Sequence, residues 1–254
     1  MSTEAAAVAV EPKTTLVEGA AAPAASENEY GVPAVPAAYK EMIDSMLARM
    51  DKEMNDEAAW QLHAEKHGIK VFTKVDGALT ACKGETFMPF HPRAILDIAI
   101  DSTNRKEVDS QLAHGGVLKE LDAQTVIEYF EYKSMFIVAG RDFCNIAHWR
   151  VLPNGTIVIV AKGIEDAELC PLKEPKIVRG DVHLAAWKIV PNAEYTGAQV
   201  FYMAKSDLKG SIPSRVAAKA ASDQPYILQR ITEALKKKNL DAAIAKGKVK
   251  NLGA

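Results

Sequence analysis

Two histidines, His63 and His67, form the first arrangement in the sequence that could hold a metal ion, with Glu65 between them. The HExxH zinc motif places its glutamate directly after the first histidine, where it can act on the metal-bound water, and a third ligand completes the site. Here the glutamate is displaced by one residue and no third ligand is evident. We therefore expect these histidines to lie at the solvated end of a helix over residues 56–66 and to bind no zinc.

Other side chains with reactive chemistry are scattered along the chain. The six histidines follow no order typical of a Ser/His/Asp or Cys/His site, and no glycine-rich phosphate loop occurs. His148 and His183 fall in predicted strands, where a hydrogen-bonded structural histidine is the common case. The sequence therefore favours a protein that is not an enzyme and that uses no cofactor and no metal.

The chain has three cysteines, Cys82, Cys144 and Cys170, whose number and spacing indicate the redox state of the compartment in which the protein works. Their number is odd and no CxxC spacing occurs, which is typical of structural thiols in a reducing environment rather than of disulfides or zinc sites. The N-terminus carries an acidic residue where a signal peptide has basic ones, and no apolar run approaches the roughly 18 residues of a membrane span. We therefore expect a cytoplasmic protein with free thiols.

The strongest structural signals lie in residues 124–164. Two runs rich in β-branched and aromatic residues, Thr125–Tyr132 and Phe143–Leu152, predict strands, and a third, Thr156–Ile164, follows an Asn-Gly pair typical of a hairpin turn. An apolar loop, residues 134–140, connects the first two strands. Because an apolar loop does not lie freely in water, we expect it to cover something or to dock on something.

Periodicity and turn residues indicate the remaining elements. Residues 1–35, rich in Ala, Pro, Glu and Ser, predict a disordered tail, and residues 239–254 a basic tail. The last predicted helix contains Pro225, which should kink or restart it. Further helices are predicted at 39–54, 93–101 and 213–238, and further strands at 69–74, 79–88, 117–121, 176–190 and 196–206.

Hairpin signals dominate and no repeated βα unit occurs, which predicts an α+β fold: an antiparallel sheet with the helices segregated to one side. Such a sheet twists and curves, so the terminal helix and a ligand, in a cavity on the order of a few hundred Å³, would fill its concave face. Residues 1–60 carry 11 acidic and 4 basic side chains, a net −7, and residues 205–254 carry 4 acidic and 11 basic, a net +7. The C-terminal part is the one that would meet an anionic surface.

Several short motifs occur together within a predicted domain at residues 36–238: Trp60 with Gly68-Ile69-Lys70-Val71-Phe72, Arg105 with Asp109, Gly140-Arg141-Asp142-Phe143, Val178-Arg179-Gly180 and Asp207–Pro213. In this order and spacing they resemble a START domain, a lipid-binding domain. The resemblance implies a helix-grip fold, in which a U-shaped antiparallel sheet grips the C-terminal helix around a lipid cavity. It also implies that this helix and the loop before Arg141 form a lid.

The resemblance also assigns residues to the cavity. Sterol-transfer members pair an acidic and a basic residue there, at positions that here are Phe130 and Ala147, so we expect no such charge pair and a ligand held by neutral hydrogen bonds. Alternate strand residues share one face, and the family register would turn Glu128 and Asn145 inward. The candidate lipid-binding residues are Glu128, Phe130, Asn145, Ala147, Trp149, Val200, Tyr202, Val216, Ala220 and Ile227.

By this resemblance the protein is a monomer that holds one lipid, such as a phospholipid or a sterol, and exchanges it at anionic membrane surfaces. Alternatives are a lipid sensor that presents its ligand to a partner and, third, an enzyme on the same fold. Nucleic acid is not expected as a partner, because the lysines at 236–238 lack interleaved aromatic residues. The candidate lid and membrane-contact residues are Met135, Phe136, Ile137, Val138, Lys209, Arg215 and Lys219.

Overall fold

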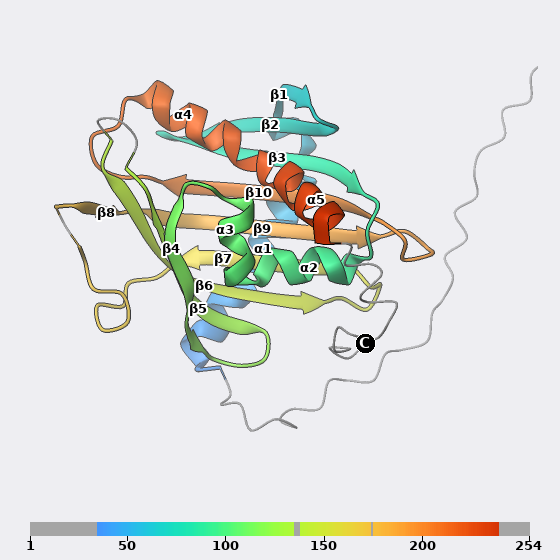
Figure 1. Cartoon of the computed structure of the whole chain (residues 1–254), viewed down its shortest axis with the longest axis horizontal. Helices are drawn as coiled ribbons and strands as arrows, with labels where there is room; N and C mark the ends of the chain where they lie inside the picture. The colour runs from blue at the N-terminus through green and yellow to red at the C-terminus, as the bar shows by residue number, and fades with distance from the viewer. Residues whose placement is uncertain (1–34, 135–137, 174, 239–254) are drawn as a thin grey trace, which may run out of the picture.

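A computed structural model describes residues 35–134, 138–173 and 175–238 of the chain. Within them, one large and almost entirely antiparallel sheet curves around the C-terminal helix, which gives an α+β architecture of the helix-grip type (Figure 1). The fold class predicted from the sequence is therefore confirmed. The tails predicted at 1–35 and 239–254 fall almost wholly outside the described residues.

The strands of the described residues form one ten-stranded sheet. Their bounds are β1 Gln61–Lys66, β2 Ile69–Asp76, β3 Leu79–Met88, β4 Leu112–Glu120, β5 Thr125–Tyr132, β6 Gly140–Val151, β7 Ile157–Gly163, β8 Ile177–Arg179, β9 Asp181–Pro191 and β10 Ala198–Asp207. The sheet follows the spatial order β1-β2-β3-β10-β9-β7-β6-β5-β4, and β8 pairs with β6 in parallel beside this path.

Helices cover both faces of this sheet, so the expectation that they lie on one side is wrong. In Figure 1 α1 lies behind the sheet, on its convex face, whereas α2, α3, α4 and α5 lie in front, on its concave face. The helical bounds are α1 Ala37–Asn55, η1 Glu57–Ala59, α2 Pro92–Ile100, α3 Ser102–Val108, α4 Ser214–Asp223, η2 Gln224–Tyr226 and α5 Ile227–Lys238, where η denotes a 3₁₀ turn.

The position of α1 follows from two apolar surfaces that must both be covered. Its stripe of Ile43, Met46 and Met50, spaced by three or four residues, is buried in one cluster with convex-face residues such as Ile146 and Leu184. An amphipathic stripe shows that a helix covers something, but it carries no information about which face of a sheet it covers. The sequence therefore predicted the helix correctly and its side of the sheet incorrectly.

Two glycine turns set the register of the central hairpins. Gly155 has a φ of +78° in the turn between β6 and β7, and Val151 pairs with Ile157 across it. Gly77 has a φ of +65° between β2 and β3. Only glycine adopts this left-handed conformation without steric cost, so the Asn-Gly and Asp-Gly signals in the sequence located both hairpins correctly.

The C-terminal helix is broken where Pro225 predicts a break. A 3₁₀ turn, η2, separates α4 from α5, because the proline ring cannot continue the hydrogen-bond pattern of an α-helix. The turn packs directly on the sheet at Gly84 of β3, where an added Cβ would lie 2.6 Å from the Cβ of Pro225. Glycine at position 84 is thus what allows the broken helix to approach the sheet.

Two secondary-structure predictions fail near the edges of the sheet. Residues 61–66, predicted as helix, form the edge strand β1 after the short turn η1. The run predicted as one strand from 176 to 190 is divided at Gly180 into β8 and β9. The N–H of Gly180 donates to the carbonyl of Asp142, and an added Cβ would overlap the ring of Phe143, so tertiary packing makes this break.

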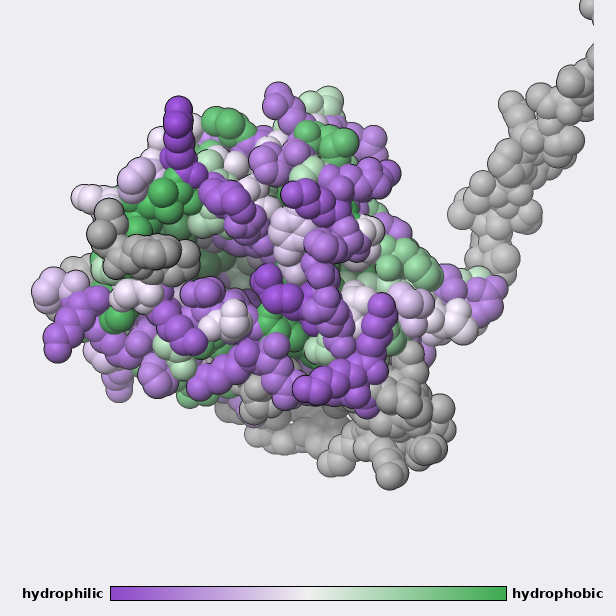
Figure 2. All heavy atoms as spheres, turned by 45° about the horizontal axis from the view of Figure 1, so that its top comes forward, coloured by the Kyte–Doolittle hydropathy of each residue, from purple (hydrophilic) through white to green (hydrophobic). Residues whose placement is uncertain are grey.

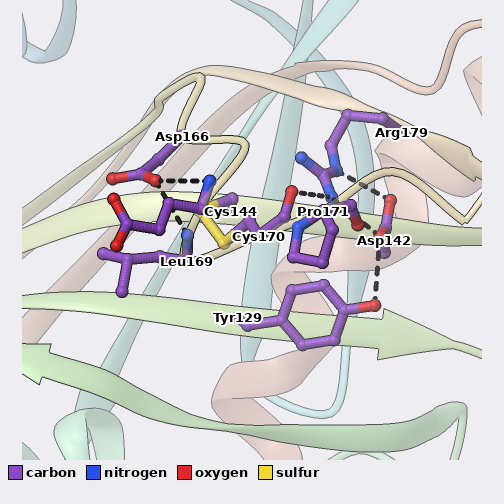
Figure 3. The surroundings of a disulfide bond; sticks show 9 residues. Tyr129, Asp142, Cys144, Asp166, Leu169, Cys170, Pro171 and Arg179 are labelled. Atoms are coloured by element: carbon purple, nitrogen blue, oxygen red, sulfur yellow. Dashed lines mark hydrogen bonds and ion pairs between the residues drawn. A yellow bond between two sulfur atoms is a disulfide. The ribbon is translucent and has the colours of Figure 1, made fainter.

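The cysteine prediction is also wrong, because Cys144 and Cys170 form a disulfide (Figure 3). Their Cα atoms lie 6.2 Å apart, within the usual range for a disulfide, and the bond ties β6 to the loop after β7. Cysteine spacing along the chain could not reveal a pair that the fold brings together across 26 residues. Cys82 is a free buried thiol, and burial raises its pKa to about 12.

No helix among the described residues is long and apolar enough to cross a membrane.

Candidate functional site

The concave face of the sheet gathers most of the predicted lipid-binding residues. On β5 and β6, residues such as Ile127 and Ile146 belong to the convex cluster with α1, so the alternate residues Glu128 and Asn145 point to the other side. Glu128 pairs directly with Asn145 across the two strands. The register expected from the family resemblance is therefore the register of the structure, although lipid contact itself remains a prediction.

Arg105 of α3 joins these two residues and makes the concave face charged. Its guanidinium lies 4.7 Å from the ring centroid of Phe130. Burial raises the pKa of Glu128, while the charge of Arg105 and a side-chain hydrogen bond with Asn145 act in the opposite direction. Burial lowers the pKa of Arg105, but Tyr132 and Glu128 outweigh it and the pKa is raised. The charges of Arg105 and Glu128 therefore attract each other, but burial prevails at Glu128, so its pKa is raised overall.

Arg105 and Glu128 add to the expectation of a cavity without a charge pair at positions 130 and 147, which stays a prediction. Phe130 and Ala147 do occupy the positions at which sterol-transfer members carry their charges, but Arg105 supplies a charge from a helix instead of a strand. The sequence contained a signal for it, since Arg105 and Asp109 were among the motifs that resembled the family. Its role was missed because α3 was not predicted as a helix that packs against the sheet.

Two tyrosines complete the polar surroundings. Burial raises the pKa of both Tyr132 and Tyr202, whereas the positive charge of Arg105 acts to lower the pKa of each. The hydroxyl of Tyr202 on β10 donates to Oε1 of Gln224 in the break of the C-terminal helix, at 3.2 Å. The ring of Tyr202 also lies 4.8 Å from that of Trp187 on β9. Tyr202 thus connects the sheet to the point at which the helix could bend.

Four polar residues indicate space between the concave face and the helices. Burial is the largest influence on the pKa of Arg105, Glu128, Tyr132 and Tyr202, which shows that protein surrounds them, yet each keeps accessible surface. Because this surface is accessible although protein surrounds it, we interpret the space beside it as the hollow expected on the concave face. Figure 2, turned to bring the α4 side forward, shows a recess with pale and green residues among hydrophilic ones.

The other predicted lipid-binding residues divide into three groups. Ala147, Trp149 and Ala220 are partly buried, and Trp149 packs against the concave-face cluster. Phe130, Val200 and Ile227 are fully buried in protein packing, so their side chains show almost no free surface to a ligand. Val216, predicted as a lipid-binding residue, is 46% exposed on α4, and α4 is the less firmly held half of the helix.

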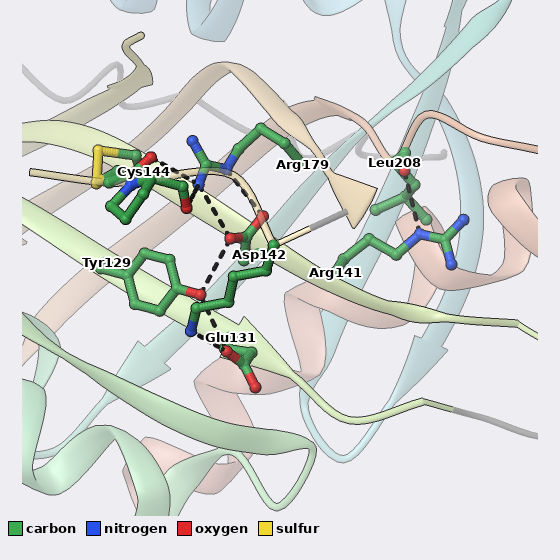
Figure 4. Close-up of polar contacts among 10 residues, drawn as sticks. Tyr129, Glu131, Arg141, Asp142, Cys144, Arg179 and Leu208 are labelled. Atoms are coloured by element: carbon green, nitrogen blue, oxygen red, sulfur yellow. Dashed lines mark hydrogen bonds and ion pairs between the residues drawn. A yellow bond between two sulfur atoms is a disulfide. The ribbon is translucent and has the colours of Figure 1, made fainter. Parts of the chain in front are cut away.

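Arg141 connects the two segments expected to form the lid (Figure 4). Its Nε donates to the carbonyl of Leu208 at 3.2 Å, and its Nη2 donates to the carbonyl of Lys209 at 3.0 Å, both in the turn before α4. Its Nη1 donates to the carbonyl of Ala139, at the end of the apolar loop. A single buried guanidinium therefore holds the end of that loop against the approach to α4.

Asp142, the next residue, points to the convex face and accepts hydrogen bonds there. It accepts two hydrogen bonds from Arg179, at 2.8 and 3.0 Å, and one from the Tyr129 hydroxyl at 3.0 Å (Figure 4). Nη2 of Arg179 also donates to the carbonyl of Cys170, so the same network reaches the disulfide loop (Figure 3). Two neighbouring residues of β6 thus hold different parts of the fold. Arg141 joins the two segments of the predicted lid, and Asp142 joins β6 to Arg179 and Tyr129 on the convex face.

The remaining lid predictions stay untested. Met135, Phe136 and Ile137 lie outside the described residues. Val138 is partly buried in a single bridge position, and Lys209, Arg215 and Lys219 are exposed around the start of α4. Lys219 forms an ion pair with Asp223 one turn later. Among the described residues no group of histidine, cysteine and acidic side chains could hold a metal ion.

Solved structures of other proteins share this fold. The chain is 19% identical to the human StAR-related lipid transfer protein 5, with a TM-score of 0.73 over 80% of this chain and 99% of that one. For human STARD10 the identity is 18% and the TM-score 0.68, over 82% and 89% of the two chains. At these identities the likeness concerns the fold alone.

A curated relative and a family model match the sequence itself. The Protein ENHANCED DISEASE RESISTANCE 2-like of Arabidopsis thaliana is 29% identical over 122 residues, which are 45% of this chain and 16% of that protein. The chain therefore spans only a small part of the length of this relative. The START domain model matches residues 38–237, most of the chain. The chain belongs to the START domain family, whose general function is lipid binding and transfer.

Proposed function

We propose that this protein holds one lipid in the hollow between the sheet and the C-terminal helix and carries it between membranes. The apolar part of the lipid would lie against partly buried residues such as Ala147 and Trp149. Burial of apolar surface, at about 25 cal/mol per Å², would retain it there. No catalytic step is part of this proposal, and the protein would act in the cytoplasm as a monomer.

The observation that carries the proposal is a pair of buried polar atoms without partners. Four buried side-chain atoms of the described residues make no hydrogen bond, and two of them, Nε of Arg105 and Oδ1 of Asn145, belong to residues that interact with Glu128. An unpaired buried polar group costs about 1–3 kcal/mol, so such groups in native proteins need an explanation. A ligand group that both accepts and donates, such as a hydroxyl or a secondary amide, would satisfy both atoms.

Opening would occur where the helix is broken and where Arg141 holds the lid. Because α4 has few buried side chains and is separated from α5 by η2, it can move while Ile227 and Leu228 keep α5 packed on the sheet. Contact of the apolar loop with a membrane would replace the Arg141 hydrogen bonds to Leu208 and Lys209. The exposed lysines near α4 would meet anionic headgroups, each contributing about 1 kcal/mol.

Mass spectrometry of lipids that co-purify with the protein, followed by transfer of that labelled lipid between vesicles, tests the proposal. Phe136→Asp combined with Ile137→Asp should slow transfer strongly and leave the lipid content unchanged. Leu172→Asp, which alters an exposed apolar residue in the disulfide loop, is the matched control and should transfer normally. A protein that neither co-purifies with lipid nor takes it up from vesicles would refute the proposal, whereas bound lipid without transfer would favour the sensor alternative.

A further inference from the structure

A second hollow lies outside the concave face, between the β1–β2 hairpin and the C-terminal helix. It has a volume of about 340 Å³ and is open to solvent. We call it the hairpin groove, and Lys219 is the one residue that it shares with the predicted lipid-binding and lid residues. Its lining consists of His63, Ala64, Lys66, His67, Lys219, Ser222, Asp223, Tyr226 and Gln229.

Two backbone irregularities bring both histidines of the hairpin to this groove. The pairing of β1 with β2 shifts between Leu62 and Ala64, so His63 is the extra residue of a β-bulge, a feature that re-aims side chains. His67 adopts a left-handed conformation with a φ of +56° in the turn that follows β1. Its ring meets that of Tyr226 edge to face at a centroid distance of 6.4 Å, which fixes its direction.

The chemistry of the lining fits an anion and not a metal ion. Two ammonium groups, on Lys66 and Lys219, and two imidazoles surround the groove, and only one carboxylate, Asp223, faces them. Within the described part of the chain, no group of side chains around it could ligate a metal ion. Lys219 is already paired with Asp223, whereas no ion pair of the described residues engages Lys66.

We propose that the hairpin groove binds a phosphate monoester. A phosphate group carries up to two negative charges and several strong acceptor oxygens, which match lysine and histidine N–H donors from two sides. The volume leaves room for a polar ring attached to the phosphate. The source of such a group is either a soluble sugar or inositol phosphate or the headgroup of a phosphorylated lipid in a membrane.

The position of the groove gives the bound phosphate a mechanical effect. His63, Lys66 and His67 belong to the hairpin, whereas Lys219 belongs to α4, the half of the helix that is less firmly held. A phosphate that contacts both sides would tie α4 to the sheet edge. Binding in the groove therefore resists movement of α4, so it should slow exchange of a molecule through the opening near that helix.

The site is tested by titrating the full chain with inorganic phosphate and with inositol 1,4,5-trisphosphate. Calorimetry and NMR measure the binding. Lys219→Gln should weaken binding roughly tenfold, since it removes one charge-assisted hydrogen bond. Asp223→Asn should instead tighten it, because the competing carboxylate is lost. Lys70→Gln removes an equal charge from the adjacent strand outside the groove and is the matched control. The double variant His63→Gln with His67→Asn, which keeps a residue that tolerates the left-handed turn, should also weaken binding.

Two further arms separate the sources of the phosphate. Binding to vesicles that contain phosphatidylinositol 4-phosphate, but not to vesicles of equal charge made with phosphatidylserine, would identify a lipid headgroup. Binding of soluble inositol phosphates alone would identify a free ligand. Equal loss of binding in Lys219→Gln and Lys70→Gln, or no tightening in Asp223→Asn, would reduce the effect to general charge attraction and overturn the proposal. This result does not depend on whether the concave face holds a lipid.

Discussion

On the convex face of the sheet, the carboxylate of Asp142 has three hydrogen bonds, two from Arg179 and one from Tyr129. On the concave face, Asn145 and Arg105 each keep a buried polar atom with no partner among the described residues. Asp142 and Asn145 lie on the same strand, β6, and point to opposite faces of the sheet. The difference in hydrogen bonding therefore comes from what packs on each face. Nε of Arg150 on the convex face is likewise unpaired among the described residues, so the contrast lies between the Asp142 carboxylate, which the protein satisfies, and the Arg105 and Asn145 atoms, which it leaves open.

Packing of apolar residues follows the same division. Under α1 the side chains of Met50, Leu184 and Ala186 are buried almost completely, and the disulfide adds a covalent tie. On the concave face Trp149 and Tyr202 keep free surface although helices cover them. Protein interiors are normally packed without such gaps, so this free surface is where the proposed ligand would lie.

The largest expected effect comes from removing one buried arginine on each face. Arg179→Met leaves the buried carboxylate of Asp142 without its ion pair, which should lower the free energy of unfolding by about 3–5 kcal/mol. Arg105→Met removes a cation that attracts the Glu128 carboxyl, and it should lower the free energy of unfolding by less, because burial already favours the neutral form of Glu128. Only Arg105→Met should also abolish lipid retention. Urea unfolding and lipid content per folded molecule measure the two effects. The double variant Arg105→Met with Glu128→Gln should regain stability but not lipid; equal lipid loss in both single variants would contradict the division between the faces.

Reduction of the disulfide is the next largest effect and belongs to the convex face alone. Opening a loop closed over 26 residues should lower the free energy of unfolding by about 3.5 kcal/mol on the chain-entropy estimate. The urea midpoint with and without dithiothreitol measures it. Cys144→Ala combined with Cys170→Ala is the control, in which dithiothreitol should cause no further change. Lipid release on reduction at unchanged folding would show that the two faces are coupled.

A matched pair of substitutions compares the available space directly. Ala186→Trp on the convex face should overpack a full core and destabilise the protein by about 1–3 kcal/mol, with the lipid still bound. Ala147→Trp on the concave face should change stability by less than about 1 kcal/mol but exclude the lipid. Thermal unfolding and mass spectrometry distinguish these outcomes. A destabilised Ala147→Trp protein that still holds lipid would place the hollow elsewhere.

The smallest effect concerns His148 and pH. Its Nδ1 lies 2.9 Å from the Thr125 hydroxyl, and burial lowers its pKa below the ordinary histidine value of about 6.5. Below that pH the unfolded chain binds the proton more readily than the folded chain, so stability should fall as pH falls from 7 through this window. His148→Gln should flatten the dependence measured by urea unfolding, whereas the exposed His114→Gln should keep it. An unchanged slope in His148→Gln would assign the dependence to another group.

The sequence predicted those features that depend on neighbouring residues. Hairpins at Gly77 and Gly155 and the helix break at Pro225 were located correctly, because each follows from the conformational limits of a single residue. The alternation on β5 and β6 was likewise predicted, since its period is fixed by the strand.

Features that depend on distant residues were not predictable in the same way. The Cys144–Cys170 disulfide, the side on which α1 packs, and the position of Arg105 opposite Glu128 all arise when separate elements meet. The charge of the interior was missed for this reason. Sequence motifs indicated that Arg105 mattered, but only the packing of α3 against the sheet shows what it faces.

The close approach of Pro225 to Gly84 has an evolutionary consequence. With only 2.6 Å between the Cβ of Pro225 and the place of a Cβ at position 84, a larger residue at 84 would push the broken helix away from the sheet. The two positions, although they lie far apart along the chain, should therefore vary together among homologues. We expect lineages that lose the proline to tolerate alanine or serine at position 84, and those that keep it to retain glycine.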